Sequence, residues 1–172
     1  MQGVGNDMDG VLVLGATNVP WELDNAIRRR FEKRVYISLP DAAARAGIFK
    51  IRTGTTKNNL TESDWSMLGM NSEGYSGSDI AVVVKEALMM PVRKCQVFKT
   101  FAPTPDGGWT PCAPSDPNAK PMTLMTMDPK LLRCPDLTID DYMGALARIK
   151  PSVNDDDVRE HVKWTEEFGQ DG

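Results

Sequence analysis

The sequence has few of the residues that build metal sites and nucleophilic catalytic sites. It contains one histidine, His161, and three cysteines that lie far apart, Cys95, Cys112 and Cys134. A structural zinc site usually has four ligands at close spacing, and Ser-His or Cys-His catalysis needs a histidine beside the nucleophile. We therefore predict no metal site, expect reduced cysteines, and expect His161 on a helix surface.

Long apolar runs and an excess of positive charge are also missing. The longest apolar stretch, Val11 to Leu14 with small flanks, is far shorter than the roughly 20 residues that span a bilayer. The first residues lack the basic and apolar stretches of a signal peptide. The net charge is -4, so no global positive field attracts nucleic acid or an acidic membrane. We expect a cytoplasmic protein with no nucleic-acid partner and no direct membrane insertion.

The N-terminal part has the pattern of an α/β protein. Val11–Leu14 is a continuous apolar run rich in β-branched residues, which is typical of a parallel strand covered on both faces. A predicted helix over Glu22–Phe31 follows, and Val35–Leu39 is a second predicted strand, closed by a proline. The fold class is therefore predicted to begin with part of a parallel sheet.

Helix signals dominate from residue 40 onward. N-cap residues and capping boxes precede most of the apolar-periodic segments, and Pro91 should bend one of them. The predicted helices cover about Ala42–Thr53, a short segment from Thr61 to Leu68, Asp79–Phe98, Thr138–Ile149 and Asn154–Phe168.

The stretch Phe101–Asp136 differs from its surroundings, because it holds eight of the twelve prolines and few charges. Proline confines strands to sheet edges, so the stretch predicts a small hairpin of Trp109–Cys112 and Met122–Met127. A disordered loop is the alternative on composition. The alternation in the methionine segment favours the hairpin.

Two features could carry chemistry. Asn18 follows the first predicted strand, at the edge where open α/β sheets bind ligands, and an amide there can position a water or contact a phosphate oxygen. Its alternative role is a turn residue before Pro20. The segment Arg28–Arg34 has five basic residues out of seven. Arginines suit bidentate phosphate contacts, and a solvated basic face is the alternative.

The joint spacing of these features resembles the second region of homology of AAA ATPases. The matching residues are Gly15-Ala-Thr-Asn18-Val-Pro20, followed by Arg28-Arg29-Arg30-Phe31. In that family the strand-end Asn is a sensor that helps to position the attacking water near the γ-phosphate of ATP, which assigns this role to Asn18. The arginine fingers, which reach the ATP of the neighbouring subunit, fall on Arg29 and Arg30. Arg28 is a weaker candidate, as an interface or phosphate-proximal helper.

The motif Gly74-Tyr-Ser-Gly77-Ser78-Asp79 also resembles the family, in which this loop packs beside the adenine. Gly77 would allow close backbone approach, and Ser78 lies where a helix N-terminus is presented. An ordinary Gly-Ser helix cap is the alternative. The cofactor that the resemblance implies for the complete protein is ATP with Mg²⁺.

Within AAA ATPases, Phe31–Pro40 resembles the meiotic clade, which includes katanin, spastin and the vacuolar sorting ATPases. The proline-rich insertion and the last helix resemble the vacuolar sorting branch, which disassembles ESCRT filaments. This implies a homo-oligomeric ring, ESCRT filament subunits as substrates, an activating cofactor protein bound at the insertion, and peripheral recruitment to endosomal membranes. It also implies that residues 1–39 end the large α/β domain. Residues 40–172 would form the small helical domain, with the insertion at 101–136 and a C-terminal helix at 154–168.

No GxxxxGK[ST] motif and no apolar strand ending in Asp-Glu occur in the sequence. We therefore expect this chain to be the C-terminal part of a longer protein, and to neither bind ATP tightly nor hydrolyse it alone. In the family, the P-loop strand lies between the two N-terminal strands, so residues 1–39 are expected to be poorly ordered or association-prone in isolation. A microtubule-severing relative and a non-catalytic docking module are the two alternative functions.

Overall fold

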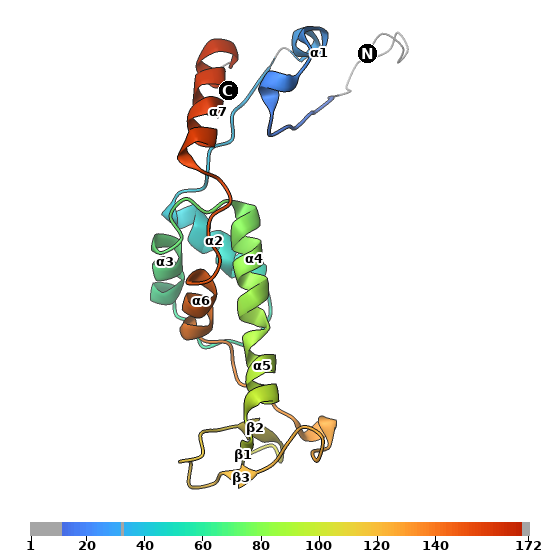
Figure 1. The fold of residues 1–172 in the computed structure, drawn as a ribbon, viewed down its shortest axis with the longest axis vertical. Coiled ribbons are helices and arrows are strands. Elements are labelled where there is room, and N and C mark those ends of the chain that lie inside the picture. Colours follow the sequence, from blue (N-terminus) through green and yellow to red (C-terminus); the bar gives the residue numbers. More distant parts are fainter. Residues whose placement is uncertain (1–11, 32, 170–172) are drawn as a thin grey trace. The chain divides into compact units, whose positions relative to one another are not determined.

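The computed structural model describes residues 12–31 and 33–169 (Figure 1). These residues divide into two compact units. The smaller unit combines the described residues up to Ser38 with those from Val153 onward, and the larger unit is Leu39–Ser152. The C-terminal helix is predicted by range to belong with residues 40–172, and in the family that the chain resembles the last helix folds back onto the large domain. In the structure the contacts of this helix lie with the N-terminal part, where its aromatic face packs on Trp21 and Tyr36, as described below.

The larger unit is a helical domain whose helices start where the sequence predicts. Helix α2 (Ala42–Thr53) packs against α3 (Glu62–Met70) and α4 (Gly77–Leu88), and α4 packs against α6 (Ile139–Leu146). Side-chain caps begin α2, α3 and α4, because each cap accepts a hydrogen bond from an otherwise unpaired backbone N–H. At the start of α6 the Asp141 carboxylate accepts from the backbone N–H of Thr138. The N-cap residues are Asp41, Thr61, Ser76 and Thr138. The fully buried side chains include Phe49, Leu68, Ile80, Val83, Leu137 and Tyr142.

Helices α2 and α3 approach closely at Gly69. A Cβ added at Gly69 would lie 2.3 Å from the carbonyl oxygen of Ala42 and 3.1 Å from the Cβ of Ala46. These atoms belong to the helix backbone or are attached directly to it, so they cannot move aside cheaply. We expect Gly69→Ala to lower the free energy of unfolding by about 1–3 kcal/mol, measured by urea titration. The control is Gly47→Ala, where a Cβ meets nothing within 4 Å; an equal loss in both variants would contradict this account.

The long predicted helix Asp79–Phe98 is two helices, α4 and α5 (Met90–Val97). Met89 ends α4 and is also the N-cap residue of α5, with Pro91 near the start of α5. Proline has no backbone N–H and its ring crowds the preceding turn, so it is tolerated in the first turn of a helix. The predicted bend at Pro91 is therefore a break followed by a new helix.

The proline-rich insertion is an ordered three-stranded antiparallel sheet in the order β2-β1-β3. The strands are β1 (Thr100–Pro103), β2 (Trp109–Pro111) and β3 (Lys120–Pro121). The prediction of β structure is confirmed, but the second predicted strand, Met122–Met127, is wrong. Thr126 N donates to the Thr123 carbonyl at 3.0 Å, which closes a turn there. Strand β1 was missed because it follows α5 after only two residues.

The two predicted N-terminal strands are absent from the part of the chain that the structure describes, where Leu12–Leu14 and Val35–Leu39 have no strand partner. Leu12 and Ile37 are 87% and 88% exposed. A strand persists only when a neighbour pairs with its backbone, and no described residue supplies that neighbour. The parallel sheet of the predicted α/β class is therefore not formed here, and Val11 itself lies outside the described residues.

The predicted helix Glu22–Phe31 is also divided. It consists of a 3-10 turn, η1 (Pro20–Glu22), and a short helix, α1 (Asn25–Arg30). Asp24 interrupts the run because its side chain accepts from Ala26 N at 2.6 Å and so caps α1. The described helices include none that is long and apolar enough to cross a membrane.

The three cysteines are free thiols, and two of them lie close together. Cys95 Sγ is 3.7 Å from Cys134 Sγ. Burial, together with the neighbouring Cys134, raises the pKa of the Cys95 thiol to about 12. Cys95 therefore stays protonated at neutral pH, which suits a buried packing residue.

Candidate functional site

Asn18 lies in the smaller unit, on the exposed segment that leads into η1. The peptide unit that follows its Cα is held by two hydrogen bonds. Val19 N donates to Thr17 Oγ1 at 3.1 Å, and the carbonyl oxygen of Asn18 accepts from His161 Nε2 at 2.9 Å. Its side-chain amide has no hydrogen-bond partner among the residues described. The amide is therefore free to meet a ligand while the main chain that carries it is fixed.

Two of the clustered arginines are tied to the C-terminal helix α7 (Asp155–Phe168). The guanidinium carbon of Arg28 lies 5.1 Å from the ring centroid of Phe168, in a cation-π contact, and Arg28 also donates to Asn25 Oδ1. Arg34 donates from NH1 to the Phe168 carbonyl at 2.8 Å. A cation at a helix C-terminus is favoured by the helix dipole, so this contact also stabilises α7.

Arg29 and Arg30 are different, because both are exposed and neither has a hydrogen-bond or ion-pair partner within residues 12–31 and 33–169. They sit in the last turn of α1, between the tied residues Arg28 and Arg34. Arg29 also lines a cleft of about 220 Å³ with Arg28, Arg34 and Phe168. The four arginines of the cluster thus divide into two that anchor it and two that can reach a ligand outside the unit, and the fifth basic residue, Lys33, is also exposed.

Helix α7 holds the segment that contains Asn18 through His161, a residue that sequence reasoning placed on a helix surface without a role. The His161 ring packs edge-on against Trp21 at 4.9 Å and stacks on Tyr36 at 6.0 Å. His161, Trp164 and Phe168 lie three and four positions apart, so they share one face of the helix. This aromatic spacing was the available sequence signal for the packing face of α7.

Gly77 and Ser78 are the first two residues of α4, in the larger unit, so only Asn18, Arg29 and Arg30 share a unit. Gly77 is partly exposed, and a Cβ added there meets nothing within 4 Å. The packing of this chain therefore gives no reason for glycine at position 77. Ser78 is exposed beside the free backbone N–H groups of the helix start.

The start of α4 is held rigid by Asp79. Burial of the Asp79 carboxyl opposes its ionisation, but hydrogen bonds from Ser76 and Ser152 outweigh burial and lower the pKa of Asp79 below its ordinary value. The stabilising contribution of this carboxylate is present above the unfolded pKa and is lost as the pH falls through the lowered one. At neutral pH the turn that presents Gly77 and Ser78 is therefore fixed.

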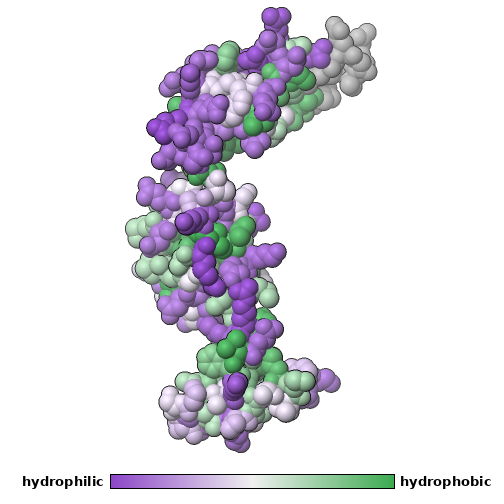
Figure 2. Space-filling view, in the orientation of Figure 1, coloured by the Kyte–Doolittle hydropathy of each residue, from purple (hydrophilic) through white to green (hydrophobic). Residues whose placement is uncertain are grey.

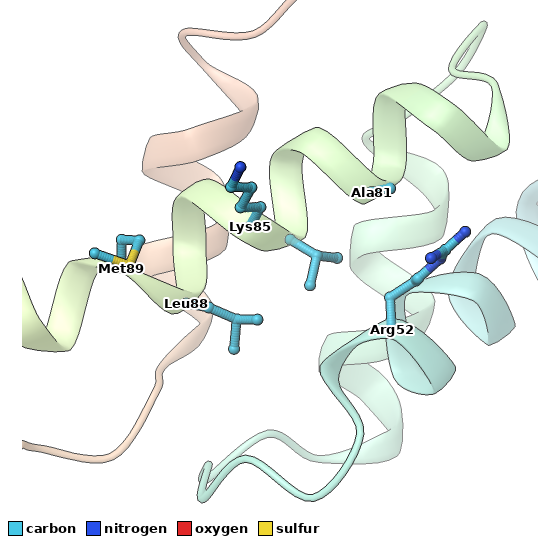
Figure 3. Close-up of a pocket in the computed structure, with 6 residues that line it drawn as sticks. Arg52, Ala81, Lys85, Leu88 and Met89 are labelled. Carbon is cyan, nitrogen blue, oxygen red and sulfur yellow. The ribbon is translucent and has the colours of Figure 1, made fainter.

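The larger unit also has a groove of about 330 Å³ between α2 and α4 (Figure 3). Its lining is mostly apolar, with the cations Arg52 and Lys85 and no carboxylate. Across the residues that the structure describes, no group of three His, Cys, Asp or Glu side chains is arranged to hold a metal ion. Asn18, Arg29 and Arg30 have N–H groups that can donate hydrogen bonds to phosphate oxygens.

Three family models match the chain in sequence order. The ATPase family associated with various cellular activities (AAA) matches residues 1–39, the AAA+ lid domain matches 62–98, and the Vps4 C terminal oligomerisation domain matches 109–169. The last of these covers most of the β insertion as well as α6 and α7. The matches follow the order of elements that the structure shows.

Known relatives match over the whole chain. Vacuolar protein sorting-associated protein 4 of Dictyostelium discoideum is 51% identical over 100% of this chain and 41% of its own length. Spastin of Naegleria gruberi is 34% identical over 98% of this chain and 28% of its own length. A crystal structure of Vps4 and Vta1 has a TM-score of 0.54 and 44% identity, covering 64% of this chain and 98% of the matched chain. The chain thus spans well under half the length of the curated relatives it matches.

Proposed function

The chain belongs to the vacuolar protein sorting-associated protein 4 family of AAA ATPases, and we propose that it is the C-terminal part of an ATPase that disassembles ESCRT filaments. The complete protein would form a homo-oligomeric ring in the cytoplasm and be recruited peripherally to endosomal membranes. Catalysis would require the upstream part of the AAA domain, so the chain alone would not hydrolyse ATP.

The observation that best supports this function is that the clustered arginines differ in their contacts. Arg28 and Arg34 fix the segment to Phe168, while Arg29 and Arg30 stay exposed and unpaired among the described residues. A structural cation cluster would use all of its members in contacts or scatter them in solvent. Two free cations on an anchored turn suit delivery of charge to a ligand held by another subunit.

In the proposed mechanism, bound ATP supplies the phosphoryl group that is transferred to water. Asn18 would hold the attacking water by hydrogen bonds from its side-chain amide, in the same subunit as the nucleotide. Arg29 and Arg30 would donate to phosphate oxygens of the neighbouring subunit's nucleotide, where negative charge develops in the transition state. The fixed main chain at Asn18 and the anchored α1 would keep these groups in place before the reaction begins.

Gly77 and Ser78 would lie beside the nucleotide base, with the backbone of Gly77 in close approach. We expect Gly77→Val in the complete protein to weaken ATP binding by about tenfold, because a side chain would occupy the space of the ligand. Isothermal titration calorimetry measures this affinity. Gly47→Val is the matched control, since a Cβ there also meets nothing within 4 Å. Equal ATP affinities of the unsubstituted protein, Gly77→Val and Gly47→Val would show that Gly77 does not lie at the nucleotide site.

The β insertion would bind an activating cofactor protein. The relative in the matched crystal structure is Vps4 together with Vta1. On the face drawn in Figure 2, the insertion has a pale to green surface with few strongly hydrophilic residues, which suits a protein partner. Replacing residues 101–136 by a short Gly-Ser linker should abolish cofactor capture in a pulldown while the helical domain keeps its circular dichroism spectrum. Retained capture would place the binding site elsewhere.

The proposed function is tested by adding the complete protein and ATP to preformed ESCRT filaments and counting filaments by electron microscopy. Loss of filaments with ATP, and not with a non-hydrolysable analogue, is the expected result. Filament loss without hydrolysis would favour a docking module. The alternative function, microtubule severing, is disfavoured because the chain is 34% identical to the spastin relative and 51% identical to the vacuolar sorting relative. Shortening of stabilised microtubules by the complete protein and ATP would instead support severing.

A further inference from the structure

His161 makes one of two hydrogen bonds that the described residues form between α7 and the N-terminal part of the smaller unit, the other being Arg34 to Phe168. Its partner is the carbonyl oxygen of Asn18, 143 positions away in sequence and on the residue that carries the proposed sensor amide. The contact joins the last helix of the chain to the main chain of a candidate catalytic residue.

Both ring nitrogens of His161 face carbonyl oxygens, which only accept, and a neutral ring carries a single N–H. We place that proton on Nε2, which then donates to the carbonyl oxygen of Asn18. The other ring nitrogen, Nδ1, lies 2.7 Å from the carbonyl oxygen of Asp157 on the same helix. Trp21 and Tyr36 contact the ring from the smaller unit, so the imidazole cannot turn freely away from Asn18.

We propose that His161 is a positioning residue for Asn18, which couples the docking of α7 to the hydrolytic step. The proposal rests on the proposed function of Asn18 as a sensor. The Thr17–Val19 hydrogen bond and the His161–Asn18 hydrogen bond hold the N–H and the C=O of one peptide unit, the one that follows the Asn18 Cα. Without His161 the carbonyl of Asn18 can rotate, and the side-chain amide moves with the backbone that carries it. Misplacement of a reacting group by about 1 Å can cost roughly a hundredfold in rate.

The two hydrogen bonds of His161 can be tested separately by replacing the histidine with glutamine or asparagine, whose amide groups differ in reach. In His161→Gln the amide nitrogen lies near the former Nε2 and can still donate to Asn18. In His161→Asn the amide nitrogen lies near the former Nδ1 and reaches only Asp157, on its own helix. The pair therefore separates the contact with Asn18 from the contact within α7, and Glu160→Gln is the control for an exposed change on the same turn.

The experiment is steady-state ATP hydrolysis by the complete protein, with thermal unfolding of each variant. His161→Asn should lower kcat by about ten- to a hundredfold with an unchanged KM for ATP, and His161→Gln should restore most of the loss. Both variants lose the ring contacts with Trp21 and Tyr36, so their unfolding temperatures should match each other and a difference in kcat between them cannot come from stability. In an Asn18→Ala background, His161→Asn should have no further effect, because its target is already gone.

The possible outcomes are distinguishable. If Asn18→Ala lowers turnover but His161→Asn does not, the positioning role is overturned while the sensor role stands. If His161→Asn lowers kcat equally with and without the Asn18 side chain, His161 acts by another route and the proposal is overturned. If Asn18→Ala leaves turnover unchanged, the proposed sensor function has failed and the proposal with it.

Discussion

Replacing Arg29 by alanine should abolish ATP turnover by the complete ring, with a loss of ~10³–10⁵-fold in kcat. The reason is electrostatic, because a guanidinium placed at the transferring phosphate stabilises charge that grows toward the transition state and is smaller in the ground state. ATP affinity should therefore change little. A coupled assay at saturating ATP gives kcat, and calorimetry gives the affinity of each variant.

The matched control for Arg29 is Arg159→Ala, which removes the same charge from an exposed side chain of α7. Arg159 forms an ion pair with Asp156 and donates to the carbonyl of Asp155, both on its own helix, and an exposed pair of this kind contributes little. The variant should keep full turnover. Arg30→Ala should behave like Arg29→Ala, since both side chains are exposed and unpaired among the described residues. Full turnover by either finger variant would remove that residue from the mechanism.

The helical domain could be predicted from the sequence because its signals are local. Each capping box joins residues three positions apart, and the Thr61–Asp64 box opens α3 as the sequence indicates. The start and end of α2 were likewise predicted from Asp41 and Gly54, which is a C-cap residue with a positive φ of 60°. Caps and glycines act within one turn, so no knowledge of tertiary contacts is needed to read them.

The β structure of the insertion was predicted, but the positions and partners of most of its strands were not, because strands are decided by partners elsewhere in the chain. Val35–Leu39 has a strand-like composition, yet no described residue pairs with it and Ile37 stays 88% exposed. Conversely β1 has two pairing neighbours and forms directly after a helix. The hydrogen bond from His161 to Asn18 is the extreme case, because the two residues lie 143 positions apart and nothing in the sequence around either one indicates the contact. Family resemblance supplied the proposed role of Asn18, and only the structure supplied its contact with His161.

Replacing Asn18 by alanine should lower kcat by about 10²–10³-fold, the range found when one preorganised hydrogen-bond donor is removed from a catalytic site. The folded state should be unaffected, because the side chain is exposed and unpaired within the described part of the chain. Single-turnover hydrolysis with preloaded ATP measures the chemical step directly. A slower product release with an unchanged chemical step would contradict the sensor role.

The decisive form of this prediction mixes the two inactive proteins. If Asn18 serves its own subunit's ATP and Arg29 serves the neighbour's, a site regains both groups when an Arg29→Ala subunit receives Arg29 from an adjacent Asn18→Ala subunit. Random equimolar rings should then recover about a quarter of wild-type turnover. If Arg29 served the ATP of its own subunit, every site in the mixture would lack one group and no activity could return. Recovery on mixing therefore tests the assignment of Asn18 and Arg29 to opposite sides of a subunit interface, independently of the size of either single loss.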